Sequence, residues 1–224
     1  MATTLTDTAL LRLLQLTSPA LPVGGYAFSQ GLEMAVECGW VTDAAQTRQW
    51  LEQQLRCSLA RVDVPLLLRL HRAAREGDLV QLRYFNAYLL ACRESAELRR
   101  TETAMGEALC RLMPELGLAL PAVGEPLGFT TAFGWVAAHW GIDEDTAAHG
   151  YLWSWLENQV AAATKLVPLG QSAAQRLLGE LLPVLVAARS VGARLPEAEI
   201  GASLPALALA SSWHENQYTR LFRS

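Results

Sequence analysis

The side chains that most often carry chemistry stand far apart in this sequence. None of the four histidines belongs to an HxxxH or HExxH pattern, the spacings that place two imidazoles on one helix face around a metal ion. A lone imidazole hydrogen-bonds to nearby groups far more often than it binds a metal. We therefore expect no directly bound metal or cofactor, and surface or locally hydrogen-bonded side chains at His71, His139, His149 and His214.

The sequence also lacks the patterns that mark nucleotide or ester hydrolysis. The only lysine, Lys165, does not follow the glycine loop that a GxxxxGK phosphate-binding motif requires. No GxSxG segment is present that could hold a nucleophilic serine on a sharp turn. These patterns predict a protein without catalytic activity of its own.

Composition and cysteine spacing limit the class of protein further. Hydrophobic residues make up 51% of the 224 positions and charged residues 18%, with a net charge of −4, so we expect a folded chain with no attraction to nucleic acid or anionic membranes. No stretch resembles a secretory signal or a membrane span. We interpret the widely spaced cysteines, which favour a reducing cytoplasm, as buried free thiols: Cys38, Cys57, Cys92 and Cys110.

Apolar residues recur at helical spacing along most of the chain. Leu and Ala dominate and Ile occurs only twice, which favours helices over strands. Asp43, Asp78 and Asp143 each stand where they could cap a helix. We predict an all-α, single-domain bundle of about nine or ten helices over residues 1–212, followed by a flexible docking tail over residues 213–224.

Two segments are unusual for plain helix connectors. The loop from Ser18 to Glu33 combines a tight Pro/Gly turn with aromatic and polar side chains, and its recognition residues are Pro22, Gly24, Gly25 and Tyr26. A connector with buried aromatics, or the roof of a small-ligand pocket, remains an alternative for this loop. The tail from Trp213 combines aromatic and Arg residues, which suits ordering on a partner better than a frayed end.

Four motifs together resemble one known family. They are LPVGGYAFSQGLE in the first loop, CRESAELR from Cys92, KLVPLGQ from Lys165 and HENQYTRLFRS at the end. In this order they resemble the urease accessory protein UreF family. The tail departs from the family pattern at Trp213, where Arg is usual, and at Asn216, where Thr is usual.

The resemblance implies a homodimeric, all-helical maturation factor without catalysis of its own. It implies that the protein bridges UreD (also called UreH) and the GTPase UreG during nickel insertion into apo-urease, so that nickel and GTP act through the partners. By the same resemblance, Glu33 and Lys165 would face UreG, and the tail contacts with UreD would come from Tyr218, Arg220, Phe222 and Arg223. A solubilising charge at Lys165, and direct nickel binding by His214 with Glu215, are the alternatives.

Overall fold

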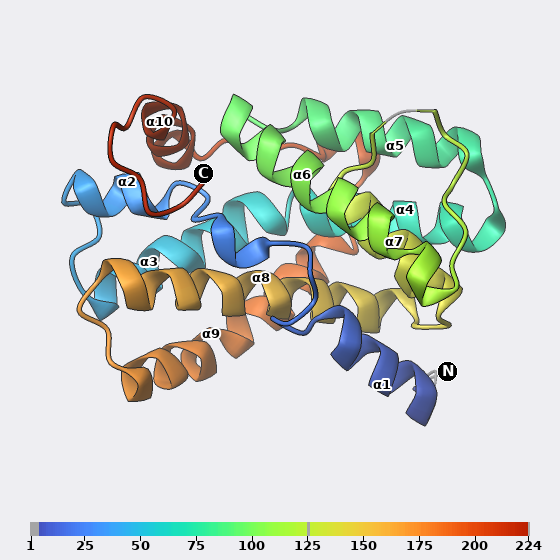
Figure 1. The fold of residues 1–224 in the computed structure, drawn as a ribbon, viewed down its shortest axis with the longest axis horizontal. Coiled ribbons are helices and arrows are strands. Elements are labelled where there is room, and N and C mark those ends of the chain that lie inside the picture. Colours follow the sequence, from blue (N-terminus) through green and yellow to red (C-terminus); the bar gives the residue numbers. More distant parts are fainter. Residues whose placement is uncertain (1–4, 125, 224) are drawn as a thin grey trace.

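The computed structural model describes residues 5–124 and 126–223, and within these ranges it consists of helices and connections without a β-strand. Figure 1 shows the ten α-helices in one bundle. The predicted all-α, single-domain fold is therefore confirmed. The helices are α1 (Asp7–Leu16), α2 (Leu32–Glu37), α3 (Ala44–Gln54), α4 (Asp63–Glu76), α5 (Leu79–Ala91), α6 (Ala96–Leu112), α7 (Phe129–His139), α8 (Glu144–Leu166), α9 (Gln171–Gly192) and α10 (Pro205–His214).

Short polar side chains begin the helices as the sequence predicts. The carboxylates of Asp43, Asp78 and Asp143 accept backbone N–H groups at the starts of α3, α5 and α8. Thr6 and Ser95 do the same for α1 and α6. Each cap satisfies amides that have no partner within the helix, so these local signals fix where five of the helices begin.

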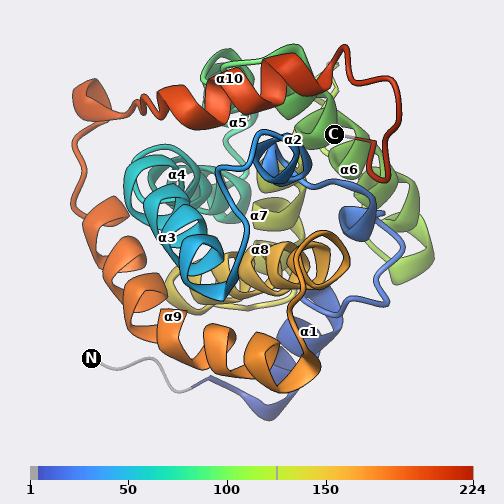
Figure 2. The same ribbon diagram turned by 90° about the vertical axis from the view of Figure 1, so that its left-hand side faces the viewer.

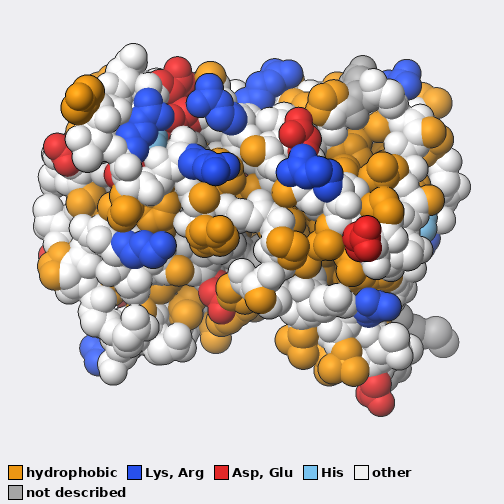
Figure 3. All heavy atoms as spheres, viewed as in Figure 1, with side chains coloured by type: hydrophobic (Ala, Val, Ile, Leu, Met, Phe, Trp, Pro, Cys, Tyr) orange, Lys and Arg blue, Asp and Glu red, His pale blue; other side chains and the backbone are white. Residues whose placement is uncertain are grey.

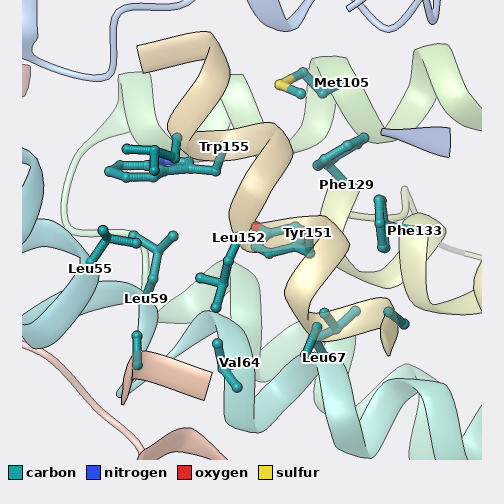
Figure 4. Packing of buried hydrophobic residues seen from close by; sticks show 14 of the residues in the cluster. Leu55, Leu59, Val64, Leu67, Met105, Phe129, Phe133, Tyr151, Leu152 and Trp155 are labelled. Atoms are coloured by element: carbon teal, nitrogen blue, oxygen red, sulfur yellow. The ribbon is translucent and has the colours of Figure 1, made fainter. Parts of the chain in front are cut away.

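The core forms around α7, which is buried along nearly its whole length. Figure 2 shows α7 and α8 in the middle of the bundle, with the other helices around them. Residues 129–137 of α7 are all buried, and Phe129 and Phe133 pack edge-on to each other with ring centroids 5.9 Å apart. Tyr151 of α8 lies 5.4 Å from the ring of Phe133, an arrangement visible in Figure 4. A helix that is hydrophobic all round is stable only when enclosed in this way.

Glycine allows α6 to lie very close to the chain that leads into α7. A Cβ atom on Gly106 would stand 2.1 Å from the carbonyl oxygen of Leu127 and 2.8 Å from the amide nitrogen of Phe129. Both neighbours are backbone atoms, which cannot move aside as a flexible side chain can. The contact positions α6, which carries Glu97 of the candidate site, against the core.

Two expectations from the sequence fail in the fold. The cysteines are free, but Cys38 is exposed and the others are only partly buried, so the interpretation as buried thiols is wrong. The proposed boundary at residue 213 falls inside α10, which continues to His214. None of the helices in the described ranges combines the length and the apolar character needed to cross a membrane.

Candidate functional site: the C-terminal clasp

His214, the last residue of α10, lies between two carboxylates. Its side chain is fully buried; Nδ1 is 2.7 Å from Oε2 of Glu97, and Nε2 is 3.0 Å from Oε2 of Glu33. An ionised carboxylate can only accept hydrogen bonds, so both contacts are satisfied only when both ring nitrogens carry a proton. Both ring nitrogens of His214 therefore face carboxylate oxygens at the carboxyl end of α10.

Glu33 of α2 ties the end of the chain to the bundle. Its side chain is buried, yet it accepts hydrogen bonds from the backbone amides of Leu221 at 2.6 Å and Phe222 at 2.9 Å, in addition to His214. Hydrogen bonds to a charged acceptor are roughly twice as strong as those between neutral groups. One carboxylate therefore anchors both α10 and the chain that follows it.

Glu97, in the first turn of α6, completes the arrangement. Its Oε1 accepts a hydrogen bond from Nη1 of Arg220 at 3.0 Å. Arg220 also donates to the carbonyl oxygens of Gln217 and Glu215, which curls the chain back after α10. We call Glu33, Glu97, His214 and Arg220 the C-terminal clasp. In the clasp each carboxylate thus faces a basic side chain: Glu33 faces His214, and Glu97 faces both His214 and Arg220.

The C-terminal segment, residues 215–223, packs on the bundle through the clasp and through one aromatic ring. Phe222 is only 5% exposed, and the ammonium of Lys165 lies 5.5 Å from the centre of its ring. The backbone amide of Arg223 donates to the carbonyl oxygen of Ala27 at 2.8 Å. The prediction that the tail lies outside the core is therefore wrong for the described part, because a buried ring and buried amides hold it there. Ser224 lies outside the described residues.

The outer side of the same segment is exposed and carries aromatic and basic groups. Tyr218 is fully exposed, Leu221 is 62% exposed, and Trp213 is exposed while its ring lies 5.6 Å from that of Trp40. Figure 3 shows basic side chains spread over the upper part of this face, above α6, α10 and the chain end. The exposed basic residues of these elements include Arg99, Arg100, Arg220 and Arg223.

The recognition loop lies beside the clasp and has a buried and an exposed part. Gly24 adopts a left-handed conformation with φ of 75° and begins a short turn over Gly25–Ala27. Tyr26 is 64% exposed, whereas Phe28 is buried. The loop therefore connects two helices through a buried aromatic and also presents an aromatic ring and the exposed Pro22 to solvent.

A second group of buried charges lies deeper in the bundle. Arg93 donates to Asp63 at 2.7 Å and to Glu102 at 2.6 Å, and we call these three residues the inner triad. Burial alone would lower the pKa of Arg93, but the two carboxylates raise it well above its usual value. Glu102 also accepts a hydrogen bond from the backbone amide of Thr130, at the start of α7.

Tyr151 of α8 adds a neutral donor to the inner triad. Its hydroxyl lies 3.0 Å from Oδ1 of Asp63 and donates to it. Burial, followed by the two carboxylates, raises the pKa of Tyr151 well above its usual value. The tyrosine therefore remains a hydrogen-bond donor to the carboxylate at neutral pH.

Comparison with known proteins decides the family. The UreF family profile matches residues 41–182. The chain belongs to the UreF family. It is 52% identical over 220 residues to the urease accessory protein UreF of Marinomonas sp. (strain MWYL1), covering 98% of this chain and 96% of the relative. The proteins of the same name from Alkalilimnicola ehrlichii (52% over 217 residues, covering 95% of each chain) and Azoarcus sp. (strain BH72) (50% over 230 residues, covering 96% and 95%) are similar to it throughout. The resemblance drawn from the four motifs is confirmed.

Within this UreF-family fold, the residues singled out from the sequence come together in part. Glu33, Lys165, Phe222 and Arg220 meet at the clasp, and Arg223 lies against the recognition loop through its backbone. Tyr218 stands apart, pointing into solvent. The interpretation of His214 as a hydrogen-bonded histidine is confirmed, but its role as the centre of the clasp was missed, as was Glu97. The described residues contain no group of His, Cys, Asp and Glu arranged to hold a metal ion.

Proposed function

We propose that this protein is a urease maturation factor that works as a scaffold without catalysis of its own. In this proposal it bridges UreD/UreH and the GTPase UreG during nickel insertion into apo-urease, acts as a homodimer, and leaves nickel and GTP to its partners. Membership in the UreF family supports the role in urease maturation. Its relatives share the name urease accessory protein, which favours an auxiliary role beside urease in our proposal.

The observation that carries the proposal is the two-sided C-terminal segment. Its inner side is fixed by Glu33 and Glu97, while Tyr218 and Leu221 are free on the outer side. Exposed aromatic and Arg side chains dominate the energy of many protein interfaces. A segment that is already ordered loses less conformational entropy when it binds, which raises its affinity for a partner. In our proposal this outer side docks on UreD/UreH.

The proposed surface for UreG lies next to this segment. Lys165 is exposed at the carboxyl end of α8 and can pair with a carboxylate on the GTPase. Glu33, in contrast, directs its carboxylate inward at three donors, so it supports such a surface by ordering the chain around Phe222. The two proposed partner surfaces therefore share the C-terminal segment.

Co-purification with UreD/UreH and UreG tests the proposal. We expect a complex containing all three proteins, whose mass fits two copies of this chain, and a change in GTP hydrolysis when nickel is added. The double substitution Tyr218→Ala with Arg223→Ala should abolish capture of UreD/UreH. The matched control, Val80→Ala with Arg111→Ala, alters an exposed apolar and an exposed basic residue away from the segment and should leave capture unchanged.

A genetic test addresses the maturation role directly. Removing the gene from a urease operon should leave apo-urease with little nickel and low activity. Full urease activity in the deletion strain at ordinary nickel concentration would contradict the proposed function. The deletion strain is then complemented with the Tyr218→Ala, Arg223→Ala double variant. Because this variant is expected to be present but unable to dock, low urease activity in that strain would be due to lost docking and not to absence of the protein.

A further inference from the structure

The exposed arginines around the C-terminal segment lie on a surface beside the clasp. Arg220 donates to Glu97 at 3.0 Å, and Arg100 lies three residues after Glu97, on the same side of α6. Arg223 is exposed at the end of the same segment, where its backbone amide donates to Ala27 at 2.8 Å. Figure 3 shows basic side chains over this upper part of the molecule. We call Arg99, Arg100, Arg220 and Arg223 the arginine surface.

Most carboxylates of the same region point inward. Glu33, Glu97 and Glu102 are buried, and each accepts hydrogen bonds from groups within the protein. Over residues 94–100 and 215–223, the exposed charged side chains are the four arginines and only two acids, Glu94 and Glu215. This region is therefore positive at its surface, although the whole chain has a net charge of −4.

Three of these arginines lack an ion-pair partner. Among the described residues no carboxylate pairs with Arg99, Arg100 or Arg223, whereas the exposed Arg72 pairs with Glu144. A guanidinium group carries its N–H donors in a planar fork that matches the two oxygens of a carboxylate. Two parallel hydrogen bonds of this kind are stronger and more specific than a contact with a point charge. A partner with carboxylates would therefore bind donors that this chain leaves exposed to water.

Aromatic and apolar side chains lie among the arginines. Tyr218 and Leu221 flank Arg220 and are exposed, and the exposed Tyr26 belongs to the loop that binds the amide of Arg223. Nucleic acid attracts proteins mainly through many phosphate contacts, which a chain of net charge −4 opposes at long range. Protein interfaces, in contrast, combine apolar and aromatic contacts with arginine pairs. The mixture of side chains therefore fits an acidic protein surface.

We propose that the arginine surface binds a cluster of Asp and Glu side chains on the docking partner, which in the proposed function is UreD/UreH. The proposal rests on that function and adds the chemistry of the partner's surface. Carboxylates of the partner pair with Arg99, Arg100 and Arg223, and its apolar side chains contact Tyr218 and Leu221. Charges at the rim of an interface mainly speed association, whereas most other contacts act on dissociation. The two kinds of contact can therefore be measured separately.

Binding kinetics at two salt concentrations test the proposal. The full chain is immobilised, and purified UreD/UreH binds it in about 50 mM and in about 500 mM NaCl, which shortens the screening length from roughly 14 Å to roughly 4 Å. We expect the association rate constant to fall at least about tenfold at the higher concentration. The dissociation rate constant should change by less than about threefold, because salt does not screen the apolar contacts.

A matched pair of double variants locates the surface. Arg100→Glu with Arg223→Glu reverses two of its charges and should slow association in about 50 mM NaCl at least about thirtyfold. Arg75→Glu with Arg194→Glu is the control, because these arginines lie on α4 and after α9, are exposed, and also have no ion-pair partner among the described residues. The control changes the net charge equally and should slow association less than about threefold. Circular dichroism and thermal unfolding first confirm that both variants fold.

Tyr218→Ala separates this inference from the docking function on which it rests. It removes an aromatic contact and should raise the dissociation rate constant, while association depends on salt as in the unchanged protein.

The remaining outcomes would overturn the proposal in distinguishable ways. Association with UreD/UreH that responds neither to salt nor to the double reversal would overturn the acidic partner surface and leave docking intact. Absence of binding at both salt concentrations would contradict docking itself, and the inference with it. Binding of a labelled DNA duplex that is lost in the Arg100→Glu, Arg223→Glu variant would assign the arginine surface to nucleic acid instead.

Discussion

The C-terminal clasp and the inner triad use the same kinds of charged group for different ends. In the inner triad, Arg93 joins α4 and α6 through Asp63 and Glu102, and all three residues belong to the bundle or its short connections. In the clasp, Glu33 and Glu97 belong to the bundle, whereas Arg220 belongs to the end of the chain. The difference indicates that the inner triad fixes how helices pack, and that the clasp fixes whether a terminal segment stays ordered.

Removing the cation of the inner triad should give the largest effect. Arg93→Ala leaves two buried carboxylates without their shared partner, and we expect the free energy of unfolding to fall by about 3–5 kcal/mol. Guanidinium unfolding followed by circular dichroism measures the loss. Arg111→Ala is the control, because its pair with Glu107 is exposed and 3.9 Å long; it should change stability by less than about 0.5 kcal/mol. Equal stability of the two variants would contradict the structural role of the triad.

Ending the chain at Asn216 should have the next largest effect. The cut removes Arg220 and the buried ring of Phe222, and we expect a loss of about 2–4 kcal/mol with the helices still formed. A cut before Trp213 should cost more, because Glu33 and Glu97 then lose His214 as well. Thermal unfolding of both forms compares them. A shortened chain as stable as the full one would show that the segment adds nothing to the fold.

A single substitution tests the clasp without removing any chain. Glu33→Gln places an amide that is part donor opposite three donors, and we expect a loss of about 1–2 kcal/mol. Hydrogen exchange at the amides of Leu221 and Phe222 should accelerate. The backbone amide of Thr130 provides the control, because it donates its hydrogen bond to Glu102 of the inner triad. It should exchange at the same rate in the variant as in the unchanged protein. Unchanged exchange at Leu221 and Phe222 would rule out Glu33 as their anchor.

Lys165 should give the smallest effect on stability and a larger one on function. Lys165 is exposed although the ring of Phe222 is buried, and at exposed sites such cation–ring contacts contribute about 0.5–1 kcal/mol. Lys165→Ala should therefore fold normally but reduce urease activation and the coupling to UreG in the reconstituted complex. Arg176→Ala, another exposed cation, should behave like the unchanged protein. Equal activity of both variants would remove Lys165 from the proposed GTPase surface.

The helices were predictable from the sequence because their signals are local. Asp43, Asp78 and Asp143 lie within three residues of the amides they cap, so a single stretch of sequence contains both partners. The clasp joins residues up to 181 positions apart. The spacing of apolar residues carries no information about pairs so far apart in the chain. The sequence motifs contain Glu33 and Arg220, but they do not show that the carboxylate of Glu33 accepts hydrogen bonds from the chain end or that the guanidinium of Arg220 donates to Glu97. A cavity between the recognition loop and helices α3, α6 and α8 is shaped by side chains from several helices, so the sequence could suggest a pocket under the loop but not its shape.

Glu33 binds the backbone amides of Leu221 and Phe222, and backbone amides are common to every residue except proline. The anchoring of the segment therefore places little constraint on the outward side chains beside it. Tyr218 and Leu221 can change over evolution while the grip on the chain persists. A protein built in this way can follow the divergence of its partner's surface without having to redesign its own fold.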